Sequence, residues 1–300
     1  MRWLAGRVAG VAGVVAAVFA TAWLLFALLR PNLFPPDPRP LPVRLGEAMW
    51  DAAHFEFGRT TNLGGAPEVG DVLLAGLPAD LQLLAGGVAA GLALGIGTAV
   101  ACAGRPDGPL AHVAGAVAVV AQCAPVYVVG LFLLLTFGEQ IGTAGLPFGI
   151  PLQYVELTDG GPGRWLAAII VPWIVLGLPL AGITFRMMRG SLRDSAREDF
   201  LLAARARGVA PRVLRLRHHA RFAVAPTITL AGAATNATIL NLAIVERVFG
   251  ASGTYRHLDD AVATADVGLL LGLTFVTAAY VAVAGVVVDL ALRRLDPRIP

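Results

Sequence analysis

The side chains that usually carry enzyme chemistry are few in this sequence, and their spacing fits no catalytic or metal-binding pattern. His218 and His219 are adjacent, so on a helix they would point about 100° apart and could not share a metal as an i, i+4 pair does. There is no His-Glu-x-x-His, no Cys-x-x-Cys and no glycine-rich phosphate loop. Cys102 and Cys123 lie in apolar segments and are expected to be packing residues. We therefore predict that the chain is not an enzyme and holds no metal or cofactor.

An arginine-dense segment, residues 186–221, contains the pattern with the clearest structural meaning. Its centre reads Glu198-Asp199-Phe200-Leu201-Leu202-Ala203-Ala204-Arg205-Ala206-Arg207-Gly208. Acids in the first turn suit the helix dipole, the Leu and Ala residues favour a helix, and the glycine is typical of a helix end. Four residues share one face at i, i+3, i+4 and i+7, namely Phe200, Ala203, Ala204 and Arg207. Small residues around one aromatic side chain predict docking into a groove on a partner protein.

This segment resembles the cytoplasmic loop of the permease subunits of binding-protein-dependent ABC importers, most closely the first permease of dipeptide, oligopeptide and nickel systems. The family's loop reads Glu-Asp-Tyr-Val-Arg-Thr-Ala-Arg-Ala-Lys-Gly, followed by a basic stretch and Arg-His-x-x-Arg-Asn-Ala-x-x-Pro. The matching positions are Glu198, Asp199, Ala204, Arg205, Ala206, Gly208, Arg217, His218, Arg221, Ala223 and Pro226. The departures are Leu202 and Ala203, where the family has Arg-Thr, and Phe222, where it has Asn.

Shorter motifs extend the resemblance from about residue 55 to the end of the chain. They are Phe57-Gly58-Arg59, Leu77-Pro78-Ala79-Asp80-Leu81, Glu246-Arg247-Val248-Phe249-Gly250 and Leu295-Asp296-Pro297-Arg298-Ile299. The second of these differs from the family's Leu-Pro-Ala-Thr-Leu by one residue, the aspartate. After Gly250 the family continues with Pro-Gly-Leu-Gly, whereas this chain continues with Ala-Ser-Gly-Thr-Tyr.

The resemblance implies a permease subunit that moves di- or oligopeptides across the membrane by alternating access. Its implied partners are a second homologous permease in a heterodimer, two cytoplasmic ATPase subunits that bind ATP and Mg²⁺, and an external substrate-binding protein. The loop helix would be the coupling helix that docks on the ATPase, and its residues would be Glu198, Asp199, Phe200, Ala203, Ala204, Arg207 and Gly208. Nickel or another small solute as cargo, and a non-transporting membrane scaffold, remain as alternatives.

The elements that must position this loop are membrane helices. Hydrophobic residues make up 57% of the 300 residues and charged residues only 14%, against about 25% charged in a soluble domain. Because a bilayer core needs roughly 20 apolar residues as a helix, six spans are predicted. They are residues 8–29, 81–104, 109–138, 165–185, 222–245 and 267–288. We predict an all-α polytopic membrane protein, like the permease of an ABC type I importer, with one permease domain at about 55–300.

Arginine placement predicts the orientation of these spans. With the N-terminus inside, sixteen Arg residues are cytoplasmic and seven are external, as the positive-inside rule requires. The cytoplasmic segments are then 1–7, 186–221 and 289–300, and the external ones are 30–80, 139–164 and 246–266. The predicted location is the plasma (inner) membrane of a prokaryote. A net charge of +3 is too small to favour nucleic acid as a partner.

Two other interpretations of the chain stay open at this stage. The basic loop could simply be held near anionic lipid. A secondary transporter would need ion-coupling carboxylates at mid-membrane and usually inverted repeats, and the sequence displays neither clearly.

Inside the predicted spans, Gly87, Gly91 and Gly95 recur on one helix face and predict close helix packing, while Pro125 predicts a kink.

Overall fold

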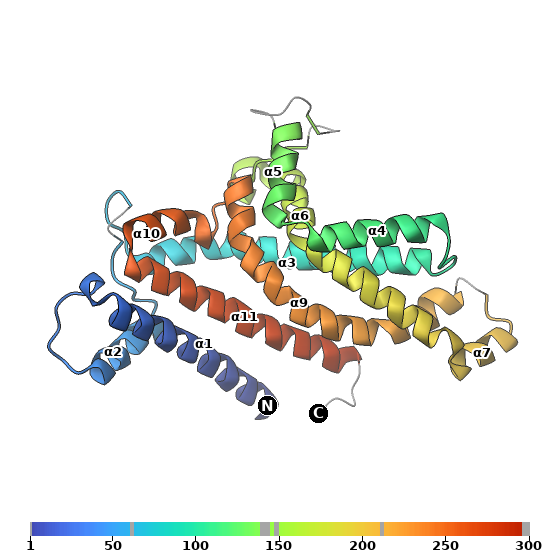
Figure 1. Cartoon of the computed structure of the whole chain (residues 1–300), viewed down its shortest axis with the longest axis horizontal. Helices are drawn as coiled ribbons and strands as arrows, with labels where there is room; N and C mark the ends of the chain where they lie inside the picture. Colours follow the sequence, from blue (N-terminus) through green and yellow to red (C-terminus); the bar gives the residue numbers. More distant parts are fainter. Residues whose placement is uncertain (1, 61–62, 139–144, 147–149, 211–212, 296–300) are drawn as a thin grey trace. The chain divides into compact units, whose positions relative to one another are not determined.

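The computed structural model describes residues 2–60, 63–138, 145–146, 150–210 and 213–295, and the described residues are overwhelmingly helical (Figure 1). The only pairing of strand type in this part of the chain is one isolated antiparallel bridge, Arg59 with Glu68. The helices in chain order are α1 (Arg2–Leu29), η1 (Pro31–Leu33), α2 (Leu41–Ala53), α3 (Val69–Cys102), α4 (Pro109–Cys123), α5 (Val126–Phe137), α6 (Leu157–Asp194), η3 (Ser195–Arg197), α7 (Asp199–Ala206), η4 (Leu214–His219), α9 (Ala220–Phe249), η5 (Thr254–His257), α10 (Leu258–Thr264) and α11 (Val267–Leu295). The all-α prediction is confirmed.

Five of these helices are long and apolar enough to cross a membrane by themselves. Their candidate spans are Gly6–Leu29, Val69–Cys102, Gly161–Asp194, Ala220–Phe249 and Val267–Arg294. The predicted third span is not one straight helix but the pair α4 and α5, bent by 104°. The predicted number of six spans therefore holds only if this bent pair is counted as one.

Pro125 explains the break in the third span. Proline cannot donate a backbone hydrogen bond and disfavours the helical conformation in the residue before it. Accordingly Ala124 and Pro125 are both extended, with ψ angles of 124° and 132°. The amide of Ala124 still donates to Val120 O at 2.7 Å, and α5 begins at Val126. A kink was expected at this position, and the structure has a bend of 104° between α4 and α5.

Several helices run beyond the predicted boundaries. α3 begins at Val69 rather than at 81, and α6 continues to Asp194, nine residues past the predicted end at 185. The first part of the predicted loop 186–221 is therefore helical. The predicted external segments also hold helices that hydropathy did not indicate, since α2 lies within 30–80 and α10 within 246–266. Both are short and carry charged residues, so a search for apolar runs passes over them.

The chain divides into two compact units, residues 1–82 with 250–286, and residues 83–249 with 287–300. The first unit has an aromatic core. Phe275 of α11 lies 5.5–6.1 Å, between ring centroids, from Phe19, Phe55 and Phe57. Edge-on contacts of this kind add to the gain from burial. They gather α1, α11 and the chain that follows α2 into one packed cluster.

In the second unit, α3 packs against α6 through the glycine stripe that the sequence indicated. A Cβ added at Gly91 would lie 2.7 Å from Gly177 O, and one added at Gly95 would overlap the side chain of Thr184. Thr184 is fully buried and donates from Oγ1 to Leu180 O at 2.8 Å, within its own helix. The prediction of close helix approach at these glycines is confirmed, since larger residues would push α3 away from α6.

Candidate functional site

The predicted docking helix exists as α7, a short helix that follows the long α6 through η3 (Figure 1). Eight residues are too few for a stable isolated helix in water, so α7 depends on packing. That packing comes from a small cluster of buried apolar residues, Leu201 and Ala204 on α7 and Leu214 of η4, with Val209 beside them. η4 thus covers one side of the helix.

Gly208 ends α7 as the sequence predicted. Its φ of +76° lies in the left-handed region, which glycine adopts without steric cost. The amide of Val209 then donates to Ala204 O at 3.2 Å, which satisfies a carbonyl at the helix end. Pro211, which follows, lies outside the described residues.

Not all residues of the predicted docking face are exposed in the structure. Ala203 and Arg207 are exposed, as are Glu198 and Asp199 at the start of the helix, and Gly208 at its end. Ala204, however, is only 4% exposed, because its methyl group faces the cluster with Leu201 and Leu214. The backbone of Phe200 lies on α7, and its side chain is outside the described part of the structure. Ala204 therefore supports α7 from within, and the exposed surface is formed by its neighbours.

The region around α7 is tied to the end of α6 by polar contacts. His219 of η4 lies 3.0 Å, ring nitrogen Nε2 to Oγ, from Ser195, and Ser195 donates to Ser191 O on α6. Between η4 and α9 the chain continues without a gap into the membrane-spanning helix. α7 is thus connected along the chain to α6 on one side and to α9 on the other. Among the described residues no group of three His, Cys, Asp or Glu side chains could hold a metal ion.

A second polar site lies in the first unit and was missed by the sequence analysis. Asp80 of α3 is fully buried. Its Oδ1 accepts a hydrogen bond from the backbone N–H of Thr254 at 3.0 Å, and its Oδ2 accepts one from the hydroxyl of Tyr280 at 2.8 Å. We call these three residues the Asp80 network. It joins α3, η5 and α11, which are far apart in the sequence.

The sequence did contain a signal for the Asp80 network. Asp80 stands where the resembling family has Thr, and Thr254 lies in the stretch that replaces the family's Pro-Gly-Leu-Gly. The two departures from the family pattern therefore contact one another. Because α3 begins at Val69, this carboxylate lies inside a candidate span, whereas the sequence analysis placed it in the external segment 30–80.

A second buried aspartate fastens the start of α11 in the same unit. Asp266 accepts a hydrogen bond from the Thr60 hydroxyl at 2.7 Å on Oδ2 and one from the Leu269 amide at 3.1 Å on Oδ1. The second contact is the side-chain N-cap of a helix. The first reaches across 206 residues of sequence. Together, the two aspartates connect α3, η5, α11 and the chain at Thr60 within the first unit.

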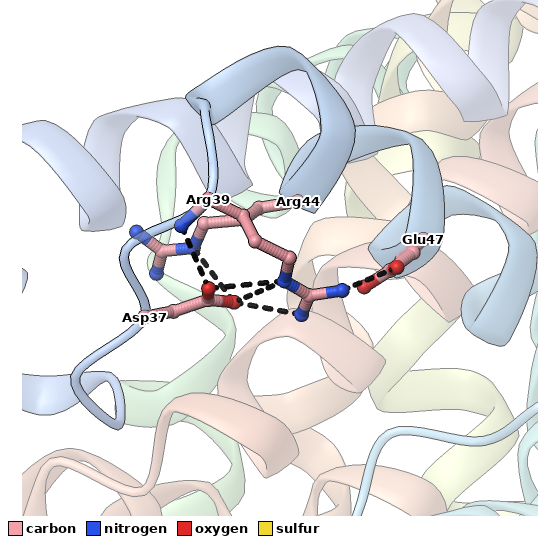
Figure 2. A network of polar contacts seen from close by, with 4 residues as sticks. All are labelled: Asp37, Arg39, Arg44 and Glu47. Carbon is pink, nitrogen blue, oxygen red and sulfur yellow. Dashed lines mark hydrogen bonds and ion pairs between the residues drawn. The ribbon is translucent and has the colours of Figure 1, made fainter.

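The segment between α1 and α2 carries an exposed ionic network (Figure 2). Asp37 accepts hydrogen bonds from the backbone amide and the guanidinium of Arg39, the shortest from Nη2 at 2.7 Å, and Arg44 Nε lies 3.7 Å away. The hydrogen bonds from Arg39 lower the pKa of Asp37 from 3.8 to about 2. In return, Asp37 and then Glu47 raise the pKa of the Arg39 guanidinium. The network lies at the surface and links the chain before α2 to Glu47 within α2.

Comparison with known proteins places these features in a family. Residues 91–300 match the family described as the binding-protein-dependent transport system inner membrane component. A putative peptide permease protein of Brucella suis is 29% identical over 261 residues, covering 87% of this chain and 80% of that protein. The oligopeptide transport system permease protein OppB of Mycobacterium bovis is 27% identical over 272 residues, covering 87% of this chain and 81% of that protein.

A third relative agrees with these two in its description. It is a probable peptide ABC transporter permease protein of Sinorhizobium fredii, 25% identical over 260 residues, which cover 87% of this chain and 80% of that protein. The family match includes α6, α7 and α9, so the loop that carries α7 lies within the matched region. With its apolar helices and this match over most of its length, the chain belongs to the family of binding-protein-dependent transport system inner membrane components.

Proposed function

We propose that this chain is the membrane-spanning permease subunit of an ATP-driven importer of di- or oligopeptides. The cargo is inferred from the curated relatives, whose names describe peptide and oligopeptide permeases. Two ATPase subunits would bind ATP and Mg²⁺, a second homologous permease would complete the pore as a heterodimer, and an external binding protein would deliver the peptide. Both chain termini would be cytoplasmic, because that orientation puts the arginine-rich loop inside.

One observation carries this proposal: α7 is a packed helix with an exposed face, inserted between two membrane-spanning helices. Ala203 and Arg207 lie one turn apart on that face and are exposed. Small side chains let the backbone of a partner approach closely, and the guanidinium can pair with a carboxylate on the ATPase. Leu201 and Ala204 hold α7 on the rest of the loop, so force applied to α7 is transmitted rather than absorbed.

The mechanism follows from this connection. Closure of the ATPase dimer on ATP would move α7, and α7 is joined to α6 through η3 and to α9 through η4. Movement of α6 and α9 would then change which side of the membrane the peptide pathway faces. The permease contributes the pathway and the docking surface, and no bond of ATP or of the peptide is broken in this chain.

Co-purification tests the docking surface. Ala203→Asp introduces a charge on the exposed face, and we expect the purified complex to lose ATPase subunits and keep the second permease. Ala263→Asp is the matched control, since it makes the same change at an exposed helical alanine of α10. Ala204→Asp separates docking from folding, because a buried charge there should disrupt the loop itself. Retention of the ATPase by Ala203→Asp at wild-type stoichiometry would rule out this face as the contact.

An uptake assay tests the cargo. Cells from which the gene for this chain has been deleted should lose accumulation of a labelled oligopeptide and regain it with the wild-type chain. Accumulation of ⁶³Ni in the same cells should be unchanged by the deletion. If nickel uptake falls and peptide uptake does not, the chain would still be an importer permease but its cargo would be the metal ion.

A further inference from the structure

The second unit contains a cavity of about 620 Å³ where α3, α6 and the loop around α7 come together. This volume is in the range of sites that bind small molecules. Its lining combines two arginines of α6, Arg189 and Arg193, with apolar side chains from α3, α6, α7 and η4. We call it the arginine cavity. It lies apart from the exposed face of α7, because the residue that α7 contributes is the buried Leu201, while η4 contributes Leu214 and His219.

The charge of the arginine cavity is only partly compensated. Arg193 donates to the carboxylate of Asp107 at 2.8 Å, so its charge is paired. Arg189, one helical turn earlier, donates instead to backbone carbonyls, to Pro106 O at 2.9 Å and to Ala111 O at 3.4 Å. Its Nε is buried and has no hydrogen-bond acceptor within the described part of the chain. In that same part no carboxylate forms an ion pair with Arg189.

The same two arginines also border a second hollow, which is lined by α4 and α6. This hollow has a volume of about 440 Å³ and is lined further by Arg186 and His112. Arg186, Arg189 and Arg193 thus form a strip along one helix at the end of a candidate span. Arginine binds phosphate oxygens through two parallel N–H donors, which makes it the preferred side chain for such an anion.

The remaining walls of the arginine cavity suit hydrocarbon rather than a hydrated ion alone. They include Ala99, Cys102, Leu192 and Leu214, each 7% exposed or less. A ligand that fits both parts has an anionic phosphate at one end and an apolar portion at the other. Basic pockets between membrane helices on the cytoplasmic side are where anionic lipid headgroups bind.

We propose that the arginine cavity is a binding site for a phosphate-bearing anion, in the form of an anionic lipid whose phosphate lies beside Arg189 and Arg193. The acyl portion lies along Leu192 and the apolar end of α3. Because the site joins α3, α6 and the loop that carries α7, an occupant stabilises this loop on the membrane helices. The site does not depend on the peptide cargo or on ATPase docking.

Lipid titration by native mass spectrometry tests the site. The full-length chain, purified with its co-purifying subunits and stripped of lipid, is titrated with phosphatidylglycerol, with phosphatidylcholine, and with inorganic phosphate as competitor. We expect phosphatidylglycerol to bind more tightly than phosphatidylcholine. Arg193→Gln and Arg189→Gln should each weaken it about tenfold, the loss of one charge-assisted hydrogen bond. Phosphate that competes only weakly identifies the lipid as the ligand, and phosphate that displaces it fully at millimolar concentration identifies the free ion.

Two further variants separate a site from general charge and from misfolding. Arg294→Gln removes an exposed arginine of α11 and should leave lipid binding unchanged. Ala103→Trp fills the arginine cavity, which Ala103 lines, while keeping every arginine, and should displace the lipid. Equal binding of both lipids to the wild type, or an Arg294→Gln loss as large as that of Arg193→Gln, would overturn the proposal. So would undiminished phosphatidylglycerol binding by Ala103→Trp and Arg193→Gln alike.

Discussion

The first unit and the loop that carries α7 satisfy their polar groups in different ways. In the first unit, Asp80 bonds to residues 174 and 200 positions away, and Asp266 to one 206 positions away. In the loop, most bonds are local, such as Val209 N to Ala204 O and Leu201 N to Glu198 O. Long-range buried bonds define one arrangement of several elements, because moving any of them leaves a buried polar group unpaired.

This difference is consistent with the docking role proposed for α7. The first unit brings together segments that are far apart in the sequence. The hydrogen bonds of the buried aspartates determine how these segments align with one another. α7 is held by a few apolar contacts and keeps charged and small residues exposed. If α7 is the docking surface that we propose, it would gain its remaining order from the partner. Substitutions that remove the hydrogen bonds of the buried aspartates, or that strain the end of α7, test this difference.

Removal of the Asp80 network should have the largest effect. Asp80→Ala leaves the Tyr280 hydroxyl and the Thr254 amide without their acceptor in a buried site. We expect a loss of about 3 kcal/mol in the free energy of unfolding, measured as a lower midpoint of thermal denaturation in detergent. Asp80→Asn keeps an acceptor and should lose less. Asp71→Asn, at an exposed position of the same helix, is the control and should match the wild type. A wild-type midpoint for Asp80→Ala would show that the first unit does not depend on this network.

Removal of the second aspartate should have a smaller effect. Asp266→Ala deletes one side-chain hydrogen bond to Thr60 and the N-cap of α11. Each contributes on the order of 1 kcal/mol, so the expected loss is about 2 kcal/mol. Thr60→Val removes only the first of the two and should lose about half as much. If the two variants lose equal amounts in the same thermal assay, the cap contributes nothing and α11 is fixed by packing alone.

The end of α7 should respond more weakly than either aspartate. Gly208→Ala forces a side chain into a conformation with φ of +76°, at a cost of about 1 kcal/mol. The strain should loosen the loop locally, so we expect faster hydrogen exchange or proteolysis at 199–209 with little change in the global midpoint. Gly190→Ala is the matched control, because this glycine is helical and has open space around its Cα. If the loop is equally protected from exchange and proteolysis in both variants, its order does not depend on a glycine at position 208.

The sequence allowed the helical spans and α7 to be predicted because both depend on local pattern. Apolar runs of sufficient length must be helices in a bilayer, and the acids before α7 and Gly208 after it define that helix. What depended on distant contacts could not be read in the same way. The burial of Ala204 requires Leu214, and the role of Asp80 requires Thr254 and Tyr280. The bend at Pro125 was expected, but its size is set by what α4 and α5 pack against.

The ion pair of Asp37 with Arg39 should give the smallest effect on stability, and this effect should be lost only at low pH. Hydrogen bonds from Arg39 lower the pKa of Asp37 in the folded state to about 2, against 3.8 when unpaired. The folded state therefore binds its proton less readily, so the stabilisation is fully present above pH 3.8 and is lost as the pH falls through about 2. Because the pair is exposed, its contribution is small.

The difference in denaturation midpoint between the wild type and Asp37→Asn should be constant from pH 6 to pH 4 and vanish towards pH 2. Glu68→Gln, in the exposed pair with Arg59 at 3.7 Å, should show no such difference. A difference that persists unchanged at pH 2 would mean that Asp37 acts through its shape, by starting α2, and not through its charge.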